Sequence, residues 1–94
     1  MRLRWEADAL LDLSDLRNYI EEDNPSAAQK VAGRIIEKVN LLKEQPLLGG
    51  PGRIHNTREM IVTNTPYTII YHVSADTITI LRVFHQARQW PHQL

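Results

Sequence analysis

Residues 77–91 read TITILRVFHQARQWP, and the rest of the chain is organised around this stretch. Its first half is rich in β-branched residues and apolar at successive positions, which predicts a strand buried on both faces within a sheet. Its second half turns polar and carries Arg82, His85, Arg88 and Trp90 within nine positions. Such a strand would bring cations, an imidazole and an indole to the rim of the sheet, where we expect the protein to meet its target.

Three more runs look like strands. Residues 58–63 (REMIVT) and 67–73 (YTIIYHV) precede the last strand and are joined to it by short turns, which predicts antiparallel neighbours. Residues 1–5 (MRLRW) alternate between polar and apolar side chains and predict a short strand at the start of the chain.

The residues between these runs have helical spacing. Apolar side chains recur at steps of three and four in two segments, at Ala9, Leu13, Leu16 and Ile20 and then at Ala28, Ala32, Ile35, Val39 and Leu42. Asn24 is a good N-cap and Pro25 suits the first position of a helix over residues 25–44. Asp12 falls outside the first stripe, so we expect it to be solvated.

The element order is therefore strand, helix, helix, strand, strand, strand. It predicts an α+β fold in which a helical hairpin packs on one face of a mainly antiparallel sheet. Residues 46–57 (PLLGGPGRIHNT) hold two prolines and three glycines and predict an irregular loop near a functional surface. Arg53 and His55 in that loop are candidates for target contact. The GGPG run does not match a nucleotide-binding loop.

Composition limits the function. Ninety-four residues make one domain, residues 1–94, and the net charge is zero, so a long-range basic field for nonspecific nucleic-acid binding is not expected. There is no cysteine, no apolar run of membrane-spanning length and no visible secretory signal, which favours the cytoplasm. The four histidines lack metal-ligand spacing, so neither a metal nor another cofactor is expected.

The candidate chemistry lies in Arg82, His85 and Arg88. Cations beside an imidazole suit the recognition of phosphate or carboxylate groups, and the alternative is a solvated rim with one arginine in an ion pair. Arg58 and Glu59 must point to opposite faces of their strand, and a structural salt bridge is the favoured role for Glu59. Trp90 is either an anchor for a partner or a plug at the end of the sheet.

These residues together resemble a known family, the RelE/ParE superfamily of bacterial toxins from type II toxin–antitoxin modules. The resemblance runs in register over nearly the whole chain, through Trp5, Ala9, Asp12-Leu13, Leu16, Tyr19-Ile20, Asn24-Pro25, Ala27-Ala28, Pro46-Leu47-Leu48-Gly49, Gly52-Arg53, Thr57-Arg58-Glu59, Pro66-Tyr67, Tyr71 and residues 80–91. It implies a small cytoplasmic growth inhibitor that maintains plasmids or acts in stress responses. It also implies a cognate antitoxin as partner, with operator DNA bound only through that antitoxin.

The superfamily divides over mechanism. RelE-like members cleave mRNA on the ribosome, and ParE-like members inhibit DNA gyrase. RelE-like sequences have an arginine at the position of Thr68, three residues before Tyr71, and a lysine-rich site that has no counterpart after Lys43. The terminal tyrosine of several nucleases is also missing from the tail, QARQWPHQL. These departures favour the ParE-like reading.

Three hypotheses follow. The leading one is a gyrase inhibitor that acts by binding through Arg53, Arg58, Arg82, His85, Arg88 and Trp90. The second is a ribosome-dependent endoribonuclease in which His85 is the general acid or base and Arg58 and Arg88 hold the phosphate. The third is a degenerate toxin that only binds its antitoxin.

Overall fold

The computed structural model describes residues 1–88. Within these residues the chain forms five strands and two helices, in the order β1 (Arg2–Trp5), α1 (Ala7–Asp23), α2 (Pro25–Glu44), β2 (Gly50–Pro51), β3 (Arg58–Ile61), β4 (Tyr67–Ser74) and β5 (Thr77–His85). The predicted α+β class is confirmed, and the predicted strands and helices are present with ends shifted by one or two residues.

The described strands form one sheet in the order β1-β5-β4-β3-β2. β1 runs parallel to β5, and the other three pairs are antiparallel. β5 therefore lies inside the sheet between β1 and β4, as its apolar sequence predicts. The two residues of β2 were expected to belong to a loop, but Gly50 and Pro51 pair with Glu59 and Arg58.

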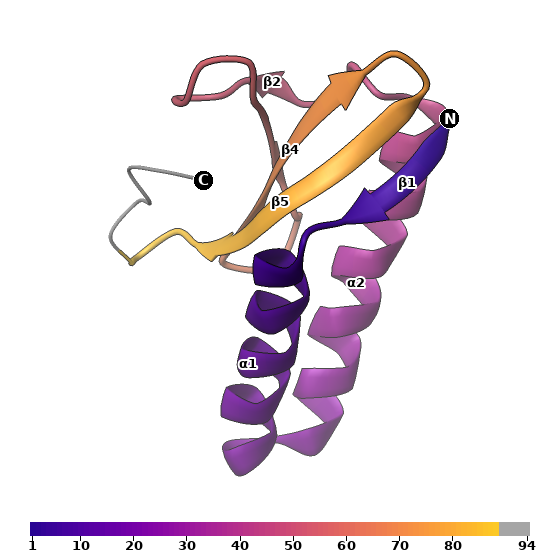
Figure 1. Cartoon of the computed structure of the whole chain (residues 1–94). Coiled ribbons are helices and arrows are strands. Elements are labelled where there is room, and N and C mark those ends of the chain that lie inside the picture. The colour runs from indigo at the N-terminus through magenta and orange to yellow at the C-terminus, as the bar shows by residue number, and fades with distance from the viewer. Residues whose placement is uncertain (89–94) are drawn as a thin grey trace.

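The helical hairpin covers one face of the sheet (Figure 1). Alternate residues of β4 and β5 pack against the buried stripes of the two helices, where the core centres on Tyr71, Ile35, Leu42, Ile69, Ile78 and Ile80. The other face is also largely buried at Thr68, Ile70 and Thr79. Both faces of the central strands are thus enclosed, which explains their nearly continuous apolar sequence.

The link between the helices has the predicted chemistry. The side chain of Asn24 accepts a hydrogen bond from the backbone N–H of Ala27 at 3.1 Å, and Pro25 occupies the first helical turn. The cap satisfies one of the amide groups that the first turn of a helix leaves unpaired. None of the helices in residues 1–88 is long and apolar enough to cross a membrane.

Asp12 is not solvated, so that expectation was wrong. Its carboxylate accepts two bonds from Arg82, Nε to Oδ2 at 2.7 Å and Nη2 to Oδ1 at 3.0 Å, and a third from the backbone N–H of Val83 at 3.0 Å. The reason lies in the topology. β1 pairs with β5 only as far as Ile80, and the β4–β5 register then shifts at Leu81. The Asp12 carboxylate therefore accepts the hydrogen bond from the Val83 backbone N–H that a neighbouring strand would otherwise accept.

Candidate functional site

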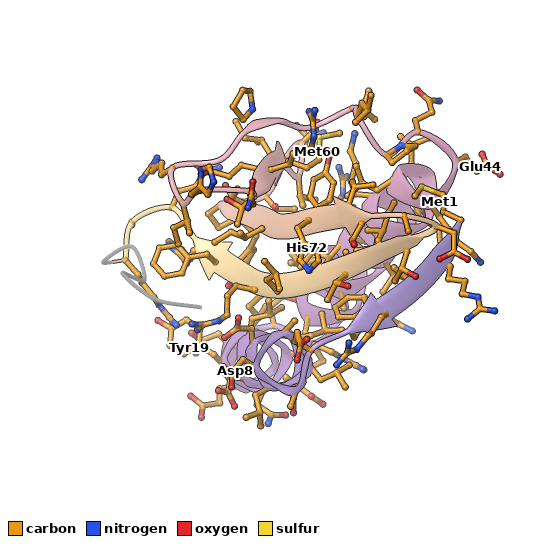
Figure 2. The ribbon with its side chains drawn as sticks, turned by 45° about the horizontal axis from the view of Figure 1, so that its top comes forward. Met1, Asp8, Tyr19, Glu44, Met60 and His72 are labelled. Atoms are coloured by element: carbon orange, nitrogen blue, oxygen red, sulfur yellow. The ribbon has the colours of Figure 1, made fainter. Side chains whose placement is uncertain are left out.

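His85 and Arg88 lie together in a shallow hollow at the end of β5. The hollow has a volume of about 370 Å³, and its lining includes Tyr19, Val31, Pro66, Tyr67, His85 and Arg88. Figure 2 shows Tyr19 beside the end of β5, and 65% of this residue's surface is exposed. The sequence placed His85 and Arg88 on one surface, and the structure brings them together there.

The orientation of His85 is set by two contacts. Its ring meets that of Tyr67 edge to face, with the centroids 5.2 Å apart, and its Nδ1 accepts a hydrogen bond from the backbone N–H of Ala87 at 3.0 Å. Because Nδ1 is an acceptor, the neutral imidazole carries its proton on Nε2. Burial raises the pKa of the Tyr67 hydroxyl, and the positive charge of Arg88 opposes part of this effect.

Arg58 lies elsewhere, near the end of α2. It pairs with Tyr71 in the sheet register, whereas His85 pairs with Tyr67. Tyr67 and Tyr71 are four residues apart on β4, which corresponds to roughly 13 Å along a strand. The Nη1 of Arg58 donates to the backbone carbonyl of Gly49 at 2.7 Å. The structure therefore does not gather Arg58, His85 and Arg88 around one point.

Arg53 lies in the segment between β2 and β3. Its backbone N–H donates to Oε2 of Glu59 at 2.7 Å, and its Nε is 3.9 Å from Oε1 of the same carboxylate. Glu59 thus has the structural role that its position in the strand favoured. The Arg53 side chain remains 68% exposed, so it is accessible to a partner.

Arg82 borders a second hollow, of about 770 Å³, on the face of the sheet opposite the helices. Its lining includes Glu6, Asp8, His55, His72, Ser74 and Arg82, and Figure 2 shows His72 near the middle of this face and Asp8 at the start of α1. The hydrogen bonding that Arg82 donates to the Asp12 carboxylate is the main cause that raises the pKa of Arg82. This hollow could not be predicted from the sequence, because its walls come from segments that only the sheet order brings together.

No group of three or more histidine, cysteine or acidic side chains in residues 1–88 could hold a metal ion. Trp90, the remaining candidate for target contact, lies outside the described residues.

Comparison with known proteins identifies the family. The model for the ParE toxin of the type II toxin–antitoxin system parDE matches residues 3–90. The chain is 45% identical to the putative toxin Y4kP of Sinorhizobium fredii over 99% of its length and 96% of the relative's. It is 37% identical to toxin RelE2 of Caulobacter vibrioides, over 89% of this chain and 93% of that one.

Solved structures agree. The chromosomal ParDE toxin–antitoxin system of Pseudomonas aeruginosa matches with a TM-score of 0.83 and 25% identity, over 90% of this chain and 95% of that one. The Escherichia coli RelBE complex matches with a TM-score of 0.66 and 14% identity, over 94% and 98%, and shows the shared fold. The chain therefore belongs to the ParE family of toxins from type II toxin–antitoxin systems.

Proposed function

We propose that this toxin arrests growth by binding DNA gyrase in the cytoplasm, and that a cognate antitoxin neutralises it. The observation that carries the binding mode is the separation of the three nuclease candidates. Arg58 lies roughly 13 Å along β4 from His85, and its guanidinium is bonded to the Gly49 carbonyl. Phosphodiester cleavage needs the proton donor and the phosphate-binding cations within reach of the same group.

Gyrase is the favoured target on sequence grounds. Thr68 occupies the position of the RelE-like arginine. Its side chain is neutral and buried, so this position offers neither a cation nor an exposed contact. The sequence has no lysine after Lys43. The family model that matches is likewise the ParE one.

The proposed contact surface is the hollow at the end of β5. It combines the cationic Arg88 with the exposed ring of Tyr19 and the imidazole of His85. Aromatic and arginine side chains contribute much of the binding energy at protein interfaces. Trp90 follows Arg88 by two positions and joins this surface in the proposal on the basis of the sequence alone. Arg82 is left out because Asp12 already binds its guanidinium.

A titration of purified gyrase with the toxin in a calorimeter tests the proposal. We expect a saturable complex that Arg88→Glu weakens by about tenfold or more, since one charge reversal at an interface changes binding by more than 1.4 kcal/mol. Arg2→Glu is the matched control, because Arg2 is an exposed arginine of β1 near the opposite end of β5. Equal weakening by both variants, or no complex with the wild-type toxin, would contradict the proposal.

The endoribonuclease alternative keeps one supporting observation, which is that His85 and Arg88 line the same hollow. A translation reaction with purified ribosomes separates the two functions. A gyrase inhibitor leaves the ribosome-bound mRNA intact, whereas a nuclease cuts it and loses that cutting with His85→Ala. Induction without growth arrest would point instead to a degenerate toxin.

A further inference from the structure

Residues 46–57 form a projecting segment, which we call the arm. Two side chains of the sheet hold the arm at its base. The hydroxyl of Tyr71 accepts a hydrogen bond from the backbone N–H of Gly49 at 2.9 Å and donates one to the carbonyl of Pro46 at 2.8 Å. Arg58 donates to the carbonyl of Gly49 at 2.7 Å. Both backbone groups of Gly49 are therefore bonded to side chains of β3 and β4.

The fit at Gly49 is close. A Cβ atom built there would come within 2.6 Å of the Tyr71 hydroxyl and 2.7 Å of the Glu59 carbonyl, so only glycine fits without a shift of its neighbours. Tyr71 itself is completely buried. The base of the arm is thus a fixed point and not a flexible hinge.

The outer part of the arm is also held in place. The backbone N–H of Gly52 donates to the carbonyl of Thr57 at 2.8 Å, and the Thr57 hydroxyl donates to the carbonyl of Ile54 at 2.6 Å. Asn56 adopts a left-handed backbone conformation, with φ at 64°, which asparagine tolerates better than most residues. Figure 1 shows this part projecting past β2, away from the two helices. A segment with this many internal bonds is preorganised for contact.

The surface of the arm has the chemistry of an interface. Leu47 and Leu48 are 66% and 43% exposed, although both are large apolar residues. Arg53 and His55 are exposed farther along the arm, and Arg53 is the only lysine, arginine or acidic residue among residues 46–57. Apolar contact plus one cation complements a protein surface that carries carboxylates next to apolar side chains.

We propose that the arm contacts the toxin's protein target at such an acidic and apolar surface, and that Arg58 and Tyr71 are positioning residues that hold the arm in its binding conformation. This inference rests on the proposed function as a toxin that acts by binding. Arg58 then acts by holding the arm in position and does not itself contact the target.

The first experiment asks whether the two residues hold the arm. Tyr71→Phe removes only the hydroxyl, and Arg58→Met keeps the length of the side chain without its donors. We expect amide hydrogen exchange in residues 49–57 to accelerate about tenfold, the factor that corresponds to about 1.4 kcal/mol. Arg2→Met, the same change on the outer strand β1, should leave exchange in the arm unchanged. Unchanged exchange in both anchor variants would overturn the positioning role.

The second experiment asks whether the arm acts on the target. The readout is the toxin level at which growth is half arrested, which we expect to rise about tenfold with His55→Ala or Leu47→Ser. Leu11→Ser, which changes a leucine of α1 that is 59% exposed, should leave this toxin level unchanged. Combining Tyr71→Phe with His55→Ala should raise it by less than the product of the two single effects, because both act through one segment. Multiplicative effects, or full potency in the arm variants, would overturn the inference.

The outcomes separate this inference from the gyrase proposal. If the arm variants relieve growth arrest but the wild-type toxin binds no gyrase, the arm stands and the target is another protein. If the toxin binds gyrase and the arm variants bind it as tightly as the wild type, the proposed role of the arm is wrong and the gyrase proposal stands. A wild-type chain that causes no growth arrest overturns both.

Discussion

Asp12 joins two distant parts of the chain, the first helix and the last strand, through one side chain. It binds the guanidinium of Arg82 through two oxygens and also the backbone of Val83, with only 17% of its side chain exposed. Replacing Asp12 with alanine leaves a cation and an amide without their acceptor. We expect a loss of about 2 kcal/mol in the free energy of unfolding, measured by urea denaturation.

The control for this change is Asp15→Ala, which removes an exposed carboxylate from the same helix. Its effect should lie within about 0.5 kcal/mol of zero. An equal loss in both variants would mean that the Asp12–Arg82 pair contributes nothing beyond helix electrostatics.

Tyr71 predicts a dependence on alkaline pH. Burial raises the pKa of its hydroxyl above the usual value of 10.0, while the Gly49 hydrogen bond and Arg58 oppose this effect. The folded state therefore keeps its proton at pH values where the unfolded chain loses it. The stabilisation is complete below about pH 10 and is lost as the pH rises through the folded-state pKa.

We therefore expect the urea midpoint to fall as the pH rises above 10, and to fall less steeply in Tyr71→Phe. Tyr67, whose pKa is also raised by burial, contributes the remaining slope. Parallel curves for the wild type and Tyr71→Phe between pH 9 and 11 would show that Tyr71 ionises equally in both states.

At the scale of the elements, the helical hairpin depends on its link. Asn24 caps α2 through the Ala27 amide, so Asn24→Ala should cost about 1 kcal/mol of unfolding free energy, visible as lower thermal stability. Asn40→Ala removes an exposed asparagine from inside the same helix and should be neutral or slightly stabilising. A similar loss in both variants would argue against the cap.

The elements could be predicted because their signals are local. The stripe from Ala28 to Leu42, the Asn24-Pro25 start and the β-branched run of β5 each depend on near neighbours. The predictions that were wrong concern features that depend on the topology of the sheet. Asp12 reads as a surface residue on its own helix, and its burial follows only from where β1 ends beside β5. β2 likewise forms a strand only because β3 folds back along it and pairs with it.

The candidate site was predictable in part for the same reason. His85 and Arg88 are close in sequence, and one tight turn keeps them together, with the Arg88 amide bonded to the His85 carbonyl at 3.0 Å. The position of Arg58 depends on the register between β3 and β4, which cannot be read from the sequence. Its separation from His85 and its bond to Gly49 became visible only in the folded chain.

At the scale of the whole molecule, we propose that this ParE-family toxin, whose cations do not gather around one point, acts on gyrase by binding. The most direct test is a supercoiling assay with purified gyrase and relaxed plasmid, titrated with the toxin. We expect supercoiling to fall with increasing toxin and to be lost at saturation. Supercoiling that continues unchanged at a large molar excess of folded toxin would contradict it.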